Sequence, residues 1–138
     1  GQSLSLVDLG GGGASFVGEA ADSGSGYSVA SAGDVDGDGL DDILIGAPGH
    51  DQGGSNAGMT YLMLGSTVAA GITTGSASWD VGQADASFVG QYGDDYSGSS
   101  VASAGDLDGD GLDDLVIGAS QNDEGGSNSG KTYLVLGQ

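Results

Sequence analysis

The sequence predicts an all-β chain built from two consecutive four-stranded antiparallel units, the architecture of β-propeller blades. The first reason is a repeat, because Asp34 and Asp106 lie 106 − 34 = 72 positions apart and other motifs share this offset. The second is a set of short apolar runs bounded by glycines, which is typical of strands covered on both faces. The third is that no segment has a convincing helical period. Repetition on this scale indicates a solenoid, a propeller or an array.

Each repeat is predicted to contain four strands, of which the outermost comes first in the chain. The next strand is rich in Ser, Ala and Gly and suits a crowded position, and the last two are apolar on consecutive residues. The predicted strands are 4–8, 27–32, 42–46 and 59–64 in the first copy, and 77–81, 99–104, 114–118 and 131–136 in the second. We therefore divide the chain into blade units 1–72 and 73–138, which together form one propeller segment.

An acidic nine-residue loop occurs twice, at residues 34–42 and 106–114. Carboxylates at loop positions 1, 3, 5 and 9 can converge if the backbone curls around one point, and the glycines between them allow such a curl. Hard oxygen ligands in this number suit Ca²⁺, and a backbone carbonyl at position 7 can add a further one. The predicted ligands of two Ca²⁺ ions per chain are Asp34, Asp36, Asp38, Leu40 and Asp42, then Asp106, Asp108, Asp110, Leu112 and Asp114. The alternative is a pair of solvated acidic turns.

These loops are not EF-hands. Position 12, where an EF-hand needs a bidentate Glu, is Ile45 in the first loop and Ile117 in the second. An apolar triplet follows each loop directly, so each metal site is predicted to lie in the connection of a β-hairpin. Asp41 and Asp113 are predicted to point away from the ion.

Several motifs together carry a family resemblance. Phe16-Val17-Gly18, the first acidic loop and Ile45-Gly46-Ala47-Pro48 recur 72 residues later, with Ser120 in place of Pro48. The chain resembles a pair of FG-GAP repeats, the blades of the integrin α-subunit propeller. The resemblance implies Ca²⁺ binding by the loop between the first two strands of a blade. It also implies ligand binding on the opposite face, formed here by residues 49–58, 121–130 and the segments before Tyr27 and Ser99.

The number of blades differs from that of the family, whose propellers usually have seven blades in one chain. Two blades would expose an apolar face at each end, and such faces mark interaction surfaces. We expect self-assembly into a closed ring, with a head-to-tail homotrimer of six blades favoured and a tetramer of eight as the alternative. In such a ring the strand at residues 4–8 would complete the last blade of a neighbouring copy. A fragment of a longer protein is the other interpretation.

Composition limits the partners. The chain carries 20 acidic residues, one Lys or Arg, and a formal net charge of −19. Nucleic-acid binding is excluded because phosphates require a positive field. No transmembrane stretch is present, so we expect no membrane insertion. Calcium sites of this type stay filled where calcium is abundant, which favours an extracellular or cell-surface location.

Catalysis finds little support, and we predict that the chain is not an enzyme. His50 is the only histidine and has Asn122 as its counterpart in the second copy. No serine lies in a nucleophile elbow. The favoured function is a calcium-binding scaffold of the adhesion type, with an unknown protein or glycan ligand. The alternatives are a designed or ancestral-like minimal propeller that only self-assembles, and an accessory domain of a larger extracellular enzyme.

Overall fold

The computed structural model describes residues 13–73 and 78–138. The predicted strand at residues 4–8 lies outside them. The elements are β1 (Ser15–Val17), β2 (Ser28–Gly33), β3 (Asp42–Ala47), β4 (Met59–Met63), α1 (Gly65–Thr73), β5 (Ser78–Asp80), the 3₁₀-helix η1 (Val81–Gln83), β6 (Ala86–Val89), β7 (Ser97–Gly105), β8 (Asp114–Ala119) and β9 (Lys131–Val135).

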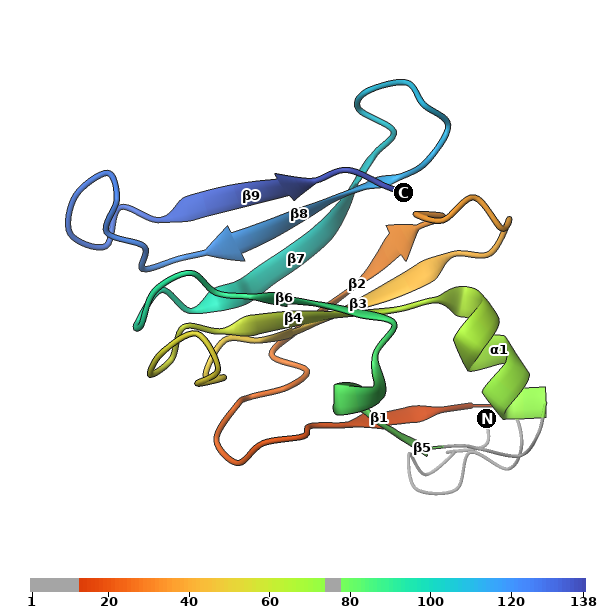
Figure 1. The fold of residues 1–138 in the computed structure, drawn as a ribbon, viewed down its shortest axis with the longest axis horizontal. Coiled ribbons are helices and arrows are strands. Elements are labelled where there is room, and N and C mark those ends of the chain that lie inside the picture. The colour runs from red at the N-terminus through yellow and green to blue at the C-terminus, as the bar shows by residue number, and fades with distance from the viewer. Residues whose placement is uncertain (1–12, 74–77) are drawn as a thin grey trace, which may run out of the picture.

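The elements form three layers, which Figure 1 shows stacked one above another. The middle layer is an antiparallel sheet in the order β2-β3-β4-β6, which we call the first blade. Above it lies the antiparallel sheet β7-β8-β9, which we call the second blade. Below it lie the parallel pair β1-β5 and the helix α1. The predicted antiparallel blades are therefore present, with four strands in the first and three described strands in the second.

The prediction that residues 77–81 form the outer strand of a blade is wrong. This segment becomes β5, which pairs in parallel with β1 and stacks Trp79 on Phe16 with 5.7 Å between ring centroids. The outer strand of the first blade is instead β6, which pairs antiparallel with β4 and places Phe88 opposite Thr60. The large apolar surface of Trp79 holds β5 in the layer below the blade. The first blade thus takes its outer strand from the second sequence repeat.

Helix α1 was also not predicted. Its sequence holds two glycines and several β-branched residues, which have low helix propensity, and Val68 is its buried residue. Tertiary contacts stabilise the helix. Val68 is part of the core below the first blade, and Ile72 packs against this core. Asp85 accepts hydrogen bonds from the backbone N–H of Leu64 (2.7 Å) and the hydroxyl of Thr67 (2.8 Å), next to the start of the helix.

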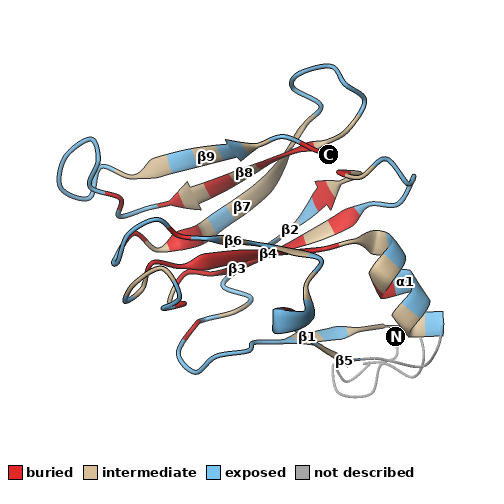
Figure 2. Cartoon of the chain, viewed as in Figure 1, coloured by how far each residue is buried: buried red, intermediate tan, exposed pale blue. Residues whose placement is uncertain are grey.

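The first blade is covered on both faces, as its consecutive apolar residues predict. One face, with Ile45 and Tyr61, packs against the layer of β1, β5 and α1. The other face, with Leu44 and Leu62, packs against Leu115 of the second blade. Figure 2 shows these buried residues concentrated on β3 and β4, between the other two layers.

Candidate metal centres

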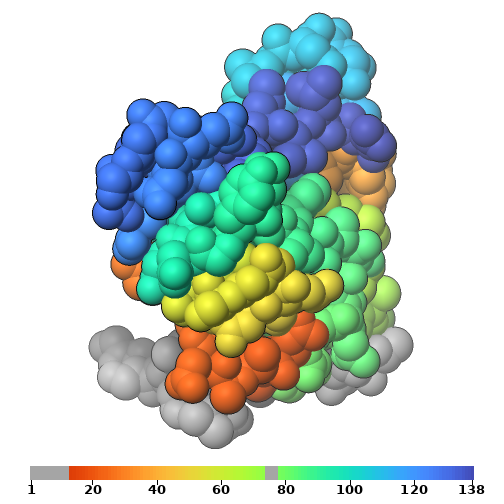
Figure 3. All heavy atoms as spheres, turned by 60° about the vertical axis from the view of Figure 1, so that its left-hand side comes forward, coloured from red at the N-terminus to blue at the C-terminus, as the bar shows by residue number. Residues whose placement is uncertain are grey.

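The two acidic loops connect β2 to β3 and β7 to β8, so each lies in the connection of a β-hairpin, as predicted. Both loops lie at the same end of the blades (Figure 1). Residues 48–58 and 120–130 connect the other ends of the strands. Figure 3 looks toward that opposite end, where the loops lie above one another in chain order.

Asp34 organises the first loop around its own carboxylate. Its Oδ1 accepts hydrogen bonds from the N–H groups of Gly37 (2.8 Å) and Asp38 (3.0 Å), and its Oδ2 accepts one from Gly39 (2.9 Å). Gly37 and Gly39 have φ angles of 77° and 87°, a region that favours glycine. The second loop repeats this arrangement, with Asp106 accepting from Gly109, Asp110 and Gly111 at 2.7, 3.0 and 2.9 Å.

Three predicted ligands converge in each loop. Ligand oxygens of each group lie within 4.8 Å of one another, and the groups are Asp34, Asp36 and Asp42, then Asp106, Asp108 and Asp114. Asp38 and Asp110, which were also predicted as ligands, are not among the carboxylates that converge in these groups. The Oδ1 atoms of those two residues accept hydrogen bonds from the N–H groups of Leu40 (2.8 Å) and Leu112 (2.9 Å). The convergence of the six grouped carboxylates agrees with the prediction. Metal ligation by all ten predicted residues, including Asp38, Asp110 and the two leucine carbonyls, stays a prediction.

The last aspartate of each group is buried and anchors the loop to the sheet. Asp42 accepts hydrogen bonds from the N–H groups of Val35 (2.9 Å) and Gly65 (2.8 Å), and Asp114 accepts the corresponding ones from Leu107 and Gly137 (2.7 and 3.0 Å). Burial raises the pKa of the Asp42 carboxyl above its usual value, although the two backbone hydrogen bonds oppose this. The nearby charges of Asp36 and Asp38 raise it further. The loop therefore places several carboxylates close together, with one of them, Asp42, shielded from solvent.

The donor set fits calcium. Each group offers carboxylate oxygens alone, without the nitrogen or sulfur donors that zinc favours. The carboxylates that already accept backbone hydrogen bonds keep further lone pairs for an ion. A bound Ca²⁺ would supply the positive charge that these clustered carboxylates lack.

Asp113 was predicted to point away from the metal, and the structure gives it a specific partner. Its Oδ2 accepts a hydrogen bond from the N–H of Asp34 (2.9 Å), and its own N–H donates to the Asp34 carbonyl (3.0 Å). The contact is close, since a Cβ on Gly33 would lie 2.0 Å from the same Oδ2. Asp113 thus links the second blade to the first acidic loop. Spacing alone gave no sign of this, because the contact joins two repeats.

We expect Asp113→Ala to lower the free energy of unfolding by about 1–3 kcal/mol, because the N–H of Asp34 loses a charged acceptor in a partly buried position. Urea unfolding in excess calcium measures this. The Asp113→Asn variant retains a side-chain oxygen and should keep most of the stability. An alanine variant as stable as the wild type would show that the contact contributes nothing.

His50 has a structural role. Its Nδ1 accepts a hydrogen bond from the N–H of Gln52 (3.2 Å), and its Nε2 lies 3.3 Å from Glu19 Oε1, which also accepts from the hydroxyl of Tyr61 (2.7 Å). This arrangement holds the turn that follows β3 against the segment that follows β1.

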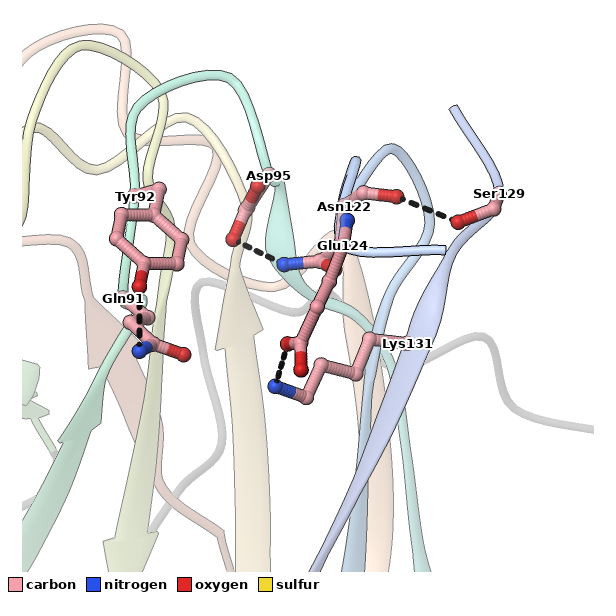
Figure 4. A network of polar contacts seen from close by, with 7 residues as sticks. All are labelled: Gln91, Tyr92, Asp95, Asn122, Glu124, Ser129 and Lys131. Carbon is pink, nitrogen blue, oxygen red and sulfur yellow. Dashed lines mark hydrogen bonds and ion pairs between the residues drawn. The ribbon is translucent and has the colours of Figure 1, made fainter. Parts of the chain in front are cut away.

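Asn122, the counterpart of His50 in the second repeat, likewise holds the turn that follows β8 against the segment that follows β6. Its Oδ1 accepts a hydrogen bond from the N–H of Glu124 (3.0 Å). Its Nδ2 donates a hydrogen bond to Asp95 Oδ2 (2.7 Å), as Figure 4 shows. Glu124 also forms an ion pair with Lys131. Histidine and asparagine can replace each other here because each accepts the N–H two residues ahead.

Comparisons with known proteins agree with the predicted resemblance. The family model described as FG-GAP repeat matches residues 25–63 and 97–135. Integrin alpha-5 of Xenopus laevis is 38% identical over 128 residues, which cover 89% of this chain and 11% of the integrin. Integrin alpha-PS2 of Drosophila melanogaster is 33% identical over 117 residues, which cover 81% of this chain and 8% of that integrin. Integrin alpha-M of Mus musculus is 38% identical over 94 residues, which cover 68% of this chain and 7% of that integrin.

The chain therefore spans only 11% and 8% of the length of the first two relatives. The match to FG-GAP repeats and to integrin alpha chains confirms the prediction that the chain is not an enzyme. In the described part of the chain, no helix has the length and hydropathy needed to cross a membrane.

Proposed function

We propose, from the premise that this chain belongs to the FG-GAP repeat family, that it is a calcium-binding β-propeller module serving as an adhesion-type scaffold. The observation that carries the proposal is the pair of aspartate groups, each with oxygens within 4.8 Å of one another. One group lies in the connection between β2 and β3, and the other lies in the corresponding connection between β7 and β8. In this proposal, calcium holds the two inner strands of a blade together and leaves the opposite end of the blades free for a protein or glycan ligand.

The proposed location and assembly follow from the same properties. Calcium sites made of exposed loops suit an extracellular or cell-surface setting, where the ion is abundant. A net charge of −19 opposes association until cations reduce the repulsion. We propose that the calcium-loaded chain self-assembles into a closed ring, with a trimer favoured over a tetramer.

Calorimetric titration of the metal-free chain is expected to show two Ca²⁺ ions bound per chain. Asp36→Asn and Asp108→Asn should each remove one ion, and the double variant should bind none, because each change removes one converging carboxylate. Mg²⁺ should bind poorly, since it prefers smaller octahedral sites and retains its waters.

The control is Asp22→Asn, which removes the same charge at an exposed position outside both loops. It should leave the stoichiometry at two. If Asp36→Asn and Asp108→Asn also retain two ions, the aspartate groups are not the binding sites.

A further inference from the structure

A hollow lies between the two blades at the end opposite the acidic loops, the end toward which Figure 3 looks. Its volume is about 370 Å³, within the range of roughly 300–1,000 Å³ that is common for small-molecule sites. The residues that line it precede β2 and β7 or follow β3 and β8, and all of them lie between Asp22 and Gln121. Both repeats therefore contribute to the hollow, and none of its lining comes from the ends of the chain.

Two tyrosines line the hollow. Tyr27, just before β2, is 73% exposed, and Tyr96, just before β7, is half-buried. Their counterparts in the other repeat are Ser99 and Gly24, which have no ring. The architecture of a blade thus does not require an aromatic residue at either position. A tyrosine at such a place offers a ligand an apolar ring with a polar hydroxyl at its tip.

Tyr96 adopts a backbone conformation that a bulky residue rarely occupies. Its φ angle is 53°, and the φ angle of its counterpart Gly24 is 66°. Among the described residues other than glycine that have a positive φ, Tyr96 alone is neither Asp nor Asn, the two types that tolerate this region best. The strain at Tyr96 has no structural purpose in the repeat, and strain of this kind is concentrated at binding sites.

Uncharged hydrogen-bonding side chains surround the tyrosines. They are those of Asn56, Gln121, Ser99 and Ser120, and amides and hydroxyls can both donate and accept hydrogen bonds. Asp22 is the one carboxylate among the lining residues, and none of them carries a positive charge. The lining therefore disfavours anionic ligands and suits a neutral molecule with many hydroxyl groups.

Hydrogen bonds hold the walls of the hollow in place. The N–H of Tyr96 donates to the Asn56 carbonyl (3.0 Å), which joins the two blades, and the N–H of Tyr27 donates to the Gly24 carbonyl (2.9 Å). The side-chain Nδ2 of Asn56 donates to Asp94 Oδ1 (3.3 Å), so its orientation is fixed. A site that is ordered before the ligand arrives loses less conformational entropy on binding.

We propose that this hollow binds an uncharged saccharide. The rings of Tyr27 and Tyr96 would contact the apolar C–H face of a sugar ring, and the polar side chains of the lining would bind the hydroxyl groups at its edge. This inference rests on the proposed function and names the ligand class at the free end of the blades.

A basic peptide is the competing ligand class, because aromatic rings and a carboxylate also bind cations. Such a ligand would depend on the charge of Asp22. With one carboxylate against four uncharged hydrogen-bonding side chains, the lining favours the saccharide.

A glycan array tests the ligand class. The calcium-loaded chain, labelled at its N-terminal amine, is applied to uncharged, sialylated and sulfated glycans and to lysine-rich peptides. The uncharged glycans should retain it, because the hollow has no cation to pair with an acidic group. Retention on no glycan, or on acidic glycans alone, would overturn the proposal. Retention on the peptides in place of glycans, lost in Asp22→Asn, would assign the hollow to cationic ligands.

Calorimetric titration with the uncharged glycan that the array retains best tests the residues. Tyr27→Ala and Tyr96→Gly should each weaken binding at least tenfold. Tyr92→Ala is the matched control, because Tyr92 is 56% exposed in the same segment as Tyr96 and does not line the hollow. It should leave binding unchanged, and equal binding by Tyr27→Ala and the wild type would contradict the assignment.

The melting temperature separates a binding role of Tyr96 from a structural one. Tyr96→Gly introduces the residue that the first repeat has at this position and removes the strain, so the melting temperature should stay the same or rise. A lower melting temperature with unchanged glycan binding would show that Tyr96 is structural.

Calcium titration of the same preparation separates this inference from the proposed function. Two bound ions without retention on any glycan would overturn the saccharide site alone. A chain that binds no calcium would overturn the proposed function, whatever the array shows.

Discussion

Removing calcium with a chelator is expected to lower the melting temperature of this chain by roughly 15–20 °C. A ligand present at 100 times its dissociation constant stabilises the folded state by about 2.7 kcal/mol per site, and there are two proposed sites. For a domain of this size each kcal/mol corresponds to roughly 3–4 °C. The effect is large because the clustered carboxylates repel one another when no ion is present.

Circular dichroism during heating, with calcium and with excess chelator, measures this shift. Repeating the experiment with the Asp36→Asn/Asp108→Asn double variant provides the control, because its melting temperature should be independent of calcium. Equal melting temperatures for the wild type in the two conditions would contradict a stabilising role for the ion.

Asp42→Ala is expected to destabilise the metal-free chain by about 2–5 kcal/mol. The buried carboxylate accepts hydrogen bonds from Val35 and Gly65, and alanine would leave both N–H groups without this acceptor. Each such loss costs about 1–3 kcal/mol. Asp42 thus has a structural role that does not depend on the ion.

Urea unfolding in chelator isolates this role. Asp36→Ala is the matched control, because Asp36 is less buried than Asp42 and accepts a single hydrogen bond, from the exposed N–H of Asp38, so its loss should change stability by less than about 1 kcal/mol in the absence of metal. Asp42→Asn should fall between the two, since the amide retains one acceptor oxygen. If the alanine variants at 36 and 42 unfold alike, the anchoring hydrogen bonds contribute little.

The sequence predicted the local features well. The acidic loops, the strands on either side of them and the convergence of Asp34, Asp36 and Asp42 depend on residues close together in the chain. Glycines at fixed positions restrict such loops to few conformations, so spacing alone is informative.

What the sequence did not predict depends on contacts between distant segments. β-compatible residues occur at both 77–81 and 86–89, and only packing on β1 and β4 decides which joins the blade. Helix α1 forms despite the low helix propensity of its residues, because Val68 is buried in the core below the first blade. The role of Asp113 depends on how two repeats stack, which no single repeat encodes.

Because β6 belongs to the second repeat and completes the first blade, the unit that is repeated in the chain is not the unit that folds. A cut between the repeats would separate β4 from its outer partner and leave each half with an unfinished sheet. The two repeats are therefore interlocked, and the boundary where a gene duplication would have joined them falls inside one cooperative structure. Gain or loss of repeats by recombination at that boundary preserves the interlock, because each new repeat brings the strand that its predecessor lacks.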